Sequence, residues 1–498
     1  MAISNPGNLL NSVPAPSQQA LSTNYLDLSS NAGWGQQYVP DLMEKEAEVF
    51  GPRTISGFLS KVGAEESMTA DQVIWSEQGR LHLSYLCDID AENVITVQSD
   101  IDGNGYVEAG IASHGIRVND TVVISNSTGV YKALVTGISA SGAGPDITVA
   151  TYDGTAIAVA ATNQATTLLV YGSEYAKATG YNVANVAAVE SRGANEPKFT
   201  TFQNKPIILK DYYEVSGSDT GKIGWVEIST EAGKSGYLWY LKAEADTRAR
   251  FTDYLEMSML EAELNMDPST GGSSASLVDT GLYGADSTNS VGTEGLFAAI
   301  TSRGNVTTGV TGTNAATDLA EFDAILAEFD KQGAIEEYMM FVNRSTSLAM
   351  DDMLASMNSY GGGGTSYGVF DNDKDMALNL GFSGFRRGSY DFYKSDFRYL
   401  NDKATRGGIN ATAGASAIRG VMIPAGVSTV YDQNMGKNMK RPFLHVRYRA
   451  SQTDNRKMKT WTTGSVGATT SALDAMQLHF LSERCLVTQG ANNFMLMK

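Results

Sequence analysis

YLWYLKAEADTRARFTDYLEMSMLEAEL, residues 237–264, is the stretch that decides the fold. It contains no Gly or Pro and spaces its apolar residues at helical intervals, which predicts one uninterrupted helix. The residues expected near one face are Leu238, Leu241, Ala245, Thr252, Leu255 and Met259. At 1.5 Å per residue the helix spans about 42 Å, which is long for a globular domain and typical of a spine across a flat molecule.

Upstream of this helix the pattern is β-like. Short apolar runs between Val94 and Val170, such as Thr121–Ile124, alternate with turn signals such as Asn126–Gly129. Closely spaced short strands predict a small barrel or sandwich of about 75 residues. Residues 205–214 predict one further strand.

Downstream of the helix, strands and helices alternate. A Gly/Ser/Thr-rich connection over 268–292 leads to a predicted helix over 318–332, with a possible capping pair in Asp318 and Glu321 and a stop at Gly333. The remaining predicted elements are a buried strand over 338–342, a helix over 345–359, and closing strands over 443–448 and 485–497. This mixture indicates an α+β fold.

The first 40 residues are poor in charge and rich in Ser, Asn, Pro and Gln. Such a composition does not bury itself, so it predicts an extended arm. A short helix is expected over 41–50, because acidic residues open that stretch and Gly51-Pro52 ends it.

Size and composition restrict the class of protein. A chain of 498 residues with 42% apolar residues is expected to form two to four structural units. No stretch is apolar enough for a membrane span and the N-terminus has no signal-peptide pattern, so we expect neither membrane association nor secretion. Cys87 and Cys485 are too few and too distant for a disulfide framework or a zinc site, and four scattered histidines give metal catalysis no foothold.

The net charge of −18 is unevenly distributed along the chain. Residues 1–200 carry −12 and residues 201–380 carry −16, whereas residues 381–498 carry +10. Either these regions pair within one chain, or acidic and basic regions of neighbouring copies meet. The acidic total disfavours binding to nucleic acid.

Two motifs imitate catalytic sites but are incomplete. Gly233-Lys234-Ser235 lies where a phosphate-binding loop would, but Ile228 replaces the required glycine and Glu231 would repel phosphate. Residues 364–368 (GTSYG) match a nucleophile elbow around Ser366, yet they follow a glycine run rather than a strand. We therefore expect a turn and a loop, respectively, and no catalytic residue or cofactor.

A third stretch, Asp100-Ile101-Asp102-Gly103-Asn104-Gly105, begins like a calcium loop. The twelfth position, where a bidentate Glu belongs, is Ile111, and the flanks are strands rather than helices. A hairpin turn is the favoured interpretation, and a calcium ion at Asp100 and Asp102 remains the alternative.

A basic run near the C-terminus is interleaved with aromatic residues. Arg447 and Arg449 alternate on one strand face, which favours an edge that pairs with another copy over a nucleic-acid surface. In the arm, Trp34 and Tyr38 could lie across a neighbour. The interface candidates are Trp34, Tyr38, Arg441, Arg447, Arg449, Arg456 and Lys457.

The order of segments resembles the major capsid proteins of tailed bacteriophages with the Hong-Kong-ninety-seven-type fold. Residues 202–208 (FQNKPII) and 213–217 (YEVSG) look like the returning strand of that family's extended loop. Residues 255–260 (LEMSML) resemble the end of its spine helix, and Gly295-Leu296-Phe297 with Phe322-Asp323 the start of its axial domain. Residues 486–494 (LVTQGANNF) resemble the terminal strand of its peripheral domain, and within the family the crAss-like phages are the nearest group.

This resemblance implies a division of the chain and a structural function. It implies an N-terminal arm (1–65), an extended loop (66–94 and 173–215) with an all-β insertion (95–172), a peripheral domain (216–290 and 455–498) and an axial domain (291–454). It further implies a non-enzymatic subunit that forms hexamers and pentamers of an icosahedral phage head. The head would enclose double-stranded DNA held only by proximity, with portal, scaffold or auxiliary proteins as partners, and would assemble in the host cytoplasm into the virion.

Three alternatives remain open. An encapsulin-like nanocompartment shell would share the fold, but the long arm and the β insertion argue against it. A tail or surface adhesin would need repeats or a trimeric β-stalk, and neither is evident. A hydrolase would use Ser366.

Overall fold

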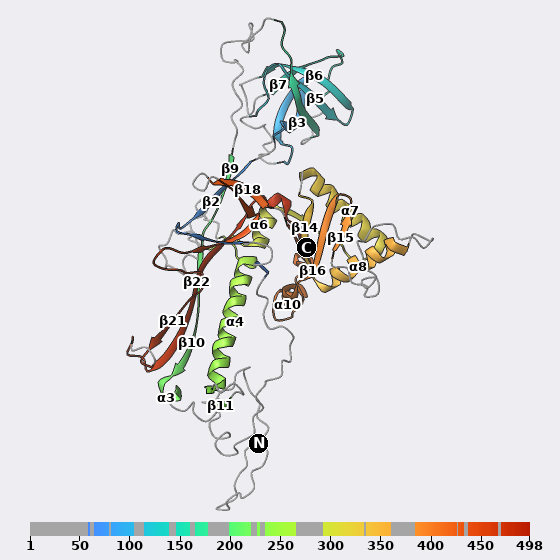
Figure 1. The fold of residues 1–498 in the computed structure, drawn as a ribbon. Coiled ribbons are helices and arrows are strands. Elements are labelled where there is room, and N and C mark those ends of the chain that lie inside the picture. Colours follow the sequence, from blue (N-terminus) through green and yellow to red (C-terminus); the bar gives the residue numbers. More distant parts are fainter. Residues whose placement is uncertain are drawn as a thin grey trace, which may run out of the picture. The chain divides into compact units, whose positions relative to one another are not determined.

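The structure is a computed structural model and divides into two compact units, Met1–Trp75 with Phe202–Lys498 (unit 1) and Ser76–Thr201 (unit 2) (Figure 1). It describes residues 58–59, 64–78, 81–103, 114–138, 146–159, 165–177, 199–220, 227–229, 235–264, 292–332, 335–359, 384–425, 427–432, 437–466 and 470–498. The expected arm and the helix over 41–50 lie outside these residues. Among the helices of the described part, none has the length and apolar character that a membrane span requires.

The first sheet of unit 1 brings together strands from both ends of the chain. Its order is β1-β20-β22-β10, and β21 also pairs with β22. The bounds are β1 (Ala64–Met68), β10 (Ile207–Ser216), β20 (Leu444–Arg449), β21 (Lys459–Gly464) and β22 (Ala475–Thr488). The 14-residue β22 pairs antiparallel with β10 on one side and with β20 and β21 on the other, whereas β1 runs parallel to β20.

The long helix predicted over 237–264 is confirmed as α4 (Leu238–Glu261), which lies along β10 and β22 (Figure 1). The predicted face is partly wrong, because Ala245 is exposed and Thr252 only half-buried. Five buried residues recur every fourth position: Ala243, Thr247, Phe251, Leu255 and Met259. Thr247 can occupy this face because its hydroxyl donates a hydrogen bond to the carbonyl of Ala243 at 2.8 Å.

Packing between α4 and the sheet is aromatic and aliphatic. Phe251 contacts Phe480 of β22 with ring centroids 5.9 Å apart, and Leu255 joins the same cluster. Each such buried side chain contributes roughly 1.5–3 kcal/mol. Arg250 of α4 also forms an ion pair with Asp211 of β10 at 3.0 Å, which fixes the helix against that strand.

A second, six-stranded sheet of unit 1 has the order β13-β23-β17-β14-β16-β15. The bounds are β13 (Asn305–Thr307), β14 (Glu337–Val342), β15 (Gly384–Arg387), β16 (Tyr390–Asp396), β17 (Gly420–Pro424) and β23 (Met495–Met497). Helices α7 (Ala315–Gln332) and α8 (Arg344–Ser359) lie beside this sheet (Figure 1). Both were predicted, but α7 begins three residues early, because Asn314 accepts a hydrogen bond from the Thr317 amide at 3.0 Å.

The expected capping pair of α7 is therefore wrong. Asp318 lies inside the helix and accepts a hydrogen bond from the Gly312 amide at 2.9 Å. Glu321 accepts one from the Thr311 amide at 2.7 Å. Both carboxylates secure the loop before the helix rather than the first turn itself.

One core connects the two sheets of unit 1. It contains Phe58, the end of α4 (Met259 and Leu260), β14 (Phe341) and β22 (Leu486). The chain passes from β22 through a short turn into β23, which lies between β13 and β17, so the C-terminal segment belongs to both sheets. The remaining elements of this unit are α3 (Gly217–Thr220), β11 (Glu227–Ser229), β12 (Ser235–Tyr237), α6 (Leu296–Arg303), α9 (Arg398–Asn401), α10 (Arg406–Asn410), η3 (Gly414–Ser416), β18 (Val427–Asp432), β19 (Lys437–Pro442) and η4 (Ala491–Asn493).

Unit 2 is a closed barrel with the order β3-β4-β7-β6-β5-β8, which confirms the prediction of a small barrel or sandwich. The bounds are β3 (Ser84–Ala91), β4 (Val94–Asp100), β5 (Asp120–Asn126), β6 (Gly129–Ile138), β7 (Asp146–Thr151) and β8 (Thr166–Ser173). Alternate residues fill its interior, as the two-residue period of a strand requires: Cys87, Ile89, Ile95, Val97, Val122, Ile124, Ala133, Val135, Ile147 and Val149. The chain enters and leaves this unit through β2 (Val73–Gln78) and β9 (Phe199–Asn204), which pair with each other.

Candidate functional site

The structure locates four of the seven predicted interface residues. Trp34 and Tyr38 lie outside the described residues, and Arg441 is described only as a backbone position in β19. Arg447, Arg449, Arg456 and Lys457 gather around β20, the end of β22 and the loop that leads to β21.

The expectation that Arg447 and Arg449 lie on an edge strand is wrong. Their strand, β20, pairs with β1 on one side and with β22 on the other. Glu66 of β1 lies opposite Arg447, and Arg484 of β22 lies opposite Tyr448. The sequence could not reveal this, because β1 comes from the opposite end of the chain and joins the sheet in parallel. An interior strand offers no free backbone edge to a second copy.

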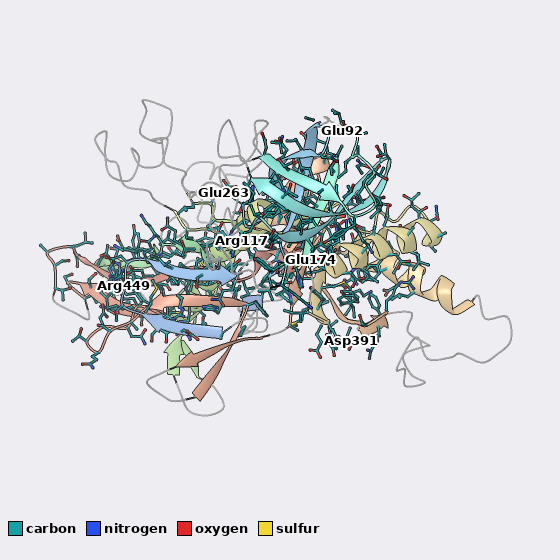
Figure 2. All side chains as sticks on the ribbon, turned by 90° about the horizontal axis from the view of Figure 1, so that it is seen from above. Glu92, Arg117, Glu174, Glu263, Asp391 and Arg449 are labelled. Carbon is teal, nitrogen blue, oxygen red and sulfur yellow. The ribbon has the colours of Figure 1, made fainter. Side chains whose placement is uncertain are left out.

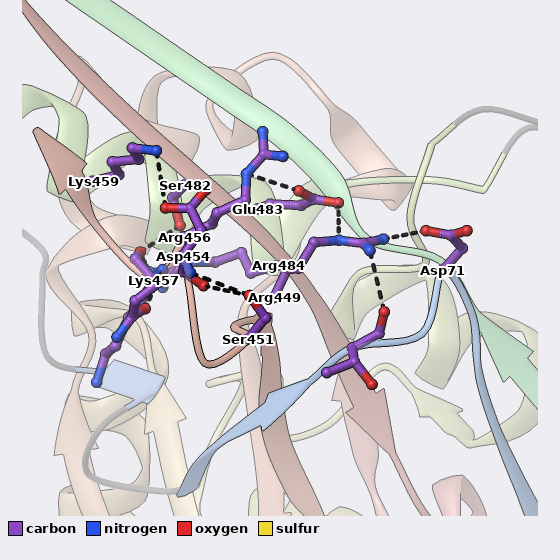
Figure 3. Close-up of polar contacts among 12 residues, drawn as sticks. Asp71, Arg449, Ser451, Asp454, Arg456, Lys457, Lys459, Ser482, Glu483 and Arg484 are labelled. Atoms are coloured by element: carbon purple, nitrogen blue, oxygen red, sulfur yellow. Dashed lines mark hydrogen bonds and ion pairs between the residues drawn. The ribbon is translucent and has the colours of Figure 1, made fainter. Parts of the chain in front are cut away.

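The acids that pair with these cations come from the same chain. Arg447 binds Glu66 of β1 at 2.8 Å. Arg449 donates to Glu483 of β22 at 2.6 Å and also contacts Asp71, just beyond β1 (Figure 3). The internal-pairing explanation of the uneven charge therefore holds at this site.

Glu483 is the centre of the network. It is 7% exposed and lies between Arg449 and Arg456, whose Nε is 3.1 Å from the second carboxylate oxygen (Figure 3). The single negative charge of Glu483 is shared by two guanidinium groups, and Asp71 supplies Arg449 with a second carboxylate. We name the set of Glu65, Glu66, Asp71, Arg447, Arg449, Arg456, Lys457, Glu483 and Arg484 the charged seam.

Arg484 extends the charged seam into the interior. Burial removes water from its guanidinium and lowers its pKa, an effect that Glu65 opposes from 3.8 Å. Its Nη2 donates to the carbonyl of Lys457 at 2.9 Å, and Lys457 in turn forms an ion pair with Glu65. Arg484 thus ties β22 both to the loop before β21 and to β1.

A shallow pocket of about 330 Å³ lies beside the charged seam. Arg456, Lys459, Trp461, Asp454 and Leu481 line it. Lys459 forms an ion pair with Asp454 at 2.9 Å, so the carboxylate that lines this pocket already has a cationic partner. Across the described part of the chain, no group of three or more His, Cys, Asp or Glu side chains could hold a metal ion.

The three stretches that resemble catalytic or calcium-binding motifs differ in how much of each the structure describes. Ser366, Gly233 and Lys234 lie outside the described residues. At the calcium-like stretch, Gly103 has a φ of +80° and its amide donates to the carbonyl of Asp100 at 3.0 Å, while Asp100 Oδ1 accepts from the amide of Asp102 at 3.1 Å. This is a tight turn whose first carboxylate serves its own backbone.

Sequence reasoning missed a buried hub at Asn204, which is 1% exposed. Its side-chain amide donates to the carbonyls of Glu294 at 3.0 Å and Leu486 at 2.6 Å. Its oxygen accepts from the hydroxyl of Thr293 at 3.1 Å and from the amide of Glu294 at 2.9 Å. Apart from the adjacent Lys205, these partners lie 89, 90 and 282 positions away, so no local signal identifies the hub.

A row of rings on the outer face of the first sheet was also missed. His479 of β22 stacks between Tyr212 of β10 and Trp461 of β21, with ring centroids 5.9 Å and 5.1 Å apart. These residues occupy directly opposed register positions. Because Phe480 faces α4, its neighbour His479 faces away from that helix.

No family model and no curated protein sequence matches the chain. The chain is similar to a solved structure from Microbacterium phage Oxtober96, with 9% identity, a TM-score of 0.35, and coverage of 95% of this chain and 99% of that one. It is also similar to the asymmetric unit of the bacteriophage PhiM1 mature capsid, with 9% identity, a TM-score of 0.31, and coverage of 63% and 78%.

A further similar structure is the virus-like particle from Pyrococcus furiosus, with 8% identity, a TM-score of 0.28, and coverage of 60% of this chain and 79% of that one. At such identities and TM-scores these likenesses carry no argument about function. The case for a function therefore depends on the arrangement of the elements themselves.

Proposed function

We propose that this chain is a capsid shell subunit, a structural protein that works by assembling with copies of itself. The supporting observation is that α4 lies lengthwise on the long strands β10 and β22 while a separate sheet carries α7 and α8. In this interpretation the first sheet with α4 is the peripheral domain, the second sheet is the axial domain, and β2 with β9 forms the root of the extended loop. These bounds differ from those expected from the sequence, because β20 (Leu444–Arg449) joins the first sheet and β23 (Met495–Met497) joins the second. The barrel is then the all-β insertion, which begins at β3 (Ser84–Ala91) rather than at residue 95.

The charged seam has a defined task in such a subunit. It fastens β1, the first described strand after the arm, to the C-terminal strands β20 and β22. An arm that reaches a neighbour transmits force to its own subunit through this attachment. In this role, internal ion pairs stabilise the subunit next to an interface, and they are made by Arg447, Arg449, Arg456 and Lys457. The residues proposed to contact a neighbouring subunit directly are Trp34, Tyr38 and Arg441.

The finer form of the proposal is a phage major capsid protein. Copies would form hexamers and pentamers of an icosahedral head around double-stranded DNA, with portal, scaffold or auxiliary proteins as partners and the crAss-like phages as the nearest group. The net charge of −18 suits this role, because an acidic chain does not trap packaged DNA. A nanocompartment shell is the alternative, and a cargo enzyme retained inside purified particles would favour it.

The experiment is sedimentation and light scattering of the full chain beside a chain that lacks residues 1–40. The full chain is expected to form particles many times its mass of 53.2 kDa. The shortened chain is expected to keep its circular-dichroism spectrum and remain small, because the arm that contacts the neighbour is gone. Unchanged particle yield without the arm would contradict its proposed role.

A further inference from the structure

The barrel of unit 2 carries a hollow of about 540 Å³ on its surface. Thr121 of β5, Lys132 of β6 and Tyr171 of β8 line it, together with Tyr152 and Glu174, which directly follow β7 and β8. Three strands of one barrel and the residue that follows a fourth thus contribute to a single surface site, and Glu174 is labelled among the side chains in Figure 2.

The backbone keeps the floor of this hollow open. The pairing of β5 with β8 shifts register between Thr121 and Val122, which is the irregularity of a β-bulge. Gly172 lies opposite Thr121, and a Cβ at that position would be 3.2 Å from the Thr121 hydroxyl. Bulges redirect side chains next to binding sites, and the missing side chain at Gly172 leaves the Thr121 hydroxyl at the floor.

Two tyrosine rings form the walls and are unusually exposed for their size. Tyr152 is 54% exposed and Tyr171 is 53% exposed, whereas the residues that precede them, Thr151 and Val170, are half-buried. Exposed rings of this kind offer flat apolar faces that remain available to a ligand.

Hydrogen bonds hold the first ring in place. The Tyr152 hydroxyl donates to Glu174 Oε2 at 2.5 Å, and its amide donates to the carbonyl of Lys132 at 3.1 Å. The amide of Glu174 donates to the carbonyl of Asn119 at 3.0 Å, so the carboxylate is anchored as well. The hydrogen bond to Glu174 raises the pKa of Tyr152 to about 12.

We propose that this hollow is a binding site for a neutral pyranose ring, such as a hexose unit of a surface polysaccharide. The C–H face of a pyranose packs on the tyrosine rings, while Thr121, Lys132 and Glu174 supply donors and acceptors for its hydroxyl groups. One positive and one negative side chain line the site, so neither an anion nor a cation is favoured. A single ring bound in an open site is expected to have a Kd in the range of about 1–10 mM, which many copies on one particle would strengthen by avidity.

Saturation-transfer NMR on the full chain tests the proposal with three probes, the methyl glycosides of glucose, galactose and mannose, each at about 10 mM. At least one probe is expected to receive saturation at its ring C–H protons. Tyr152→Ala and Tyr171→Ala are each expected to raise the Kd about tenfold or more. Tyr393→Ala is the matched control, because Tyr393 is 51% exposed but belongs to β16 of unit 1.

Charged probes decide the class of ligand. Choline and inorganic phosphate are expected to show no transfer, and Glu174→Gln is expected to weaken pyranoside binding less than either tyrosine variant, because the amide still offers an acceptor. The proposal is overturned if no glycoside receives saturation, if Tyr171→Ala behaves like Tyr393→Ala, or if choline alone binds. A melting temperature measured for each variant separates lost binding from lost folding, and none of these outcomes depends on particle assembly.

Discussion

Reversing the charge at Arg447 is expected to loosen β1 locally rather than abolish contact with another subunit. Arg447 and Glu66 are register partners on β20 and β1, and their side chains meet at 2.8 Å. Arg447→Glu would place two carboxylates opposite each other between parallel strands. The five-residue β1 has β20 as its pairing strand, so this contact has a large share in its attachment.

The magnitude follows from the burial of the pair. The side chains of Arg447 and Glu66 are 17% and 22% exposed, so the ion pair is largely shielded from water. A hydrogen bond between charged groups in such a setting contributes about 1.5–3 kcal/mol. A loss of about 2 kcal/mol in the free energy of opening β1 accelerates exchange of its amide protons roughly 30-fold.

Hydrogen exchange read by mass spectrometry over residues 64–68 measures this opening. Arg447→Glu is expected to accelerate exchange there, and the swapped pair Arg447→Glu with Glu66→Arg is expected to restore most of the protection. Arg386→Glu is the control, because Arg386 is 64% exposed and lies 3.7 Å from Asp391 in an ion pair expected to contribute little. If Arg447→Glu leaves exchange over 64–68 unchanged but abolishes assembly, the internal role is refuted. Arg447 would then contact another subunit directly.

Two further predictions concern buried groups. Asn204→Ala leaves the Leu486 carbonyl and the Glu294 amide without their partner, so we expect a loss of about 2–4 kcal/mol of unfolding free energy; a melting temperature within a degree of the wild type would contradict the hub role. Burial raises the pKa of the Cys485 thiol to about 12 and that of Cys87 above its usual range, so both stay protonated at pH 8. A colorimetric disulfide reagent is therefore expected to detect no thiol in native buffer and two per chain in urea. Fast reaction of the native protein would count against the fold.

Local patterns predicted the local elements well. The helix α4 follows from a long stretch without Gly or Pro, and the barrel follows from short apolar runs separated by turn signals. Neither pattern depends on distant parts of the chain. The face of α4 was harder to predict, because Thr247 is buried through a hydrogen bond to its own helix rather than through apolar character.

Pairings between distant segments could not be predicted. Arg449 and Asp71 are 378 positions apart, and the parallel pairing of β1 with β20 turns an apparent edge strand into an interior one. The sequence therefore points to Arg447 and Arg449 as residues of an edge strand, whereas the structure places them on an interior strand. Their alternation does place both on one strand face, but the carboxylates they meet belong to their own chain.

Negative-stain electron microscopy of the purified full chain, over a range of salt and protein concentrations, tests the central claim most directly. A shell subunit is expected to yield closed shells, tubes or rings with five- and six-fold symmetry. A monomer that persists under all of these conditions would contradict the claim that copies of this chain assemble with one another without a second protein.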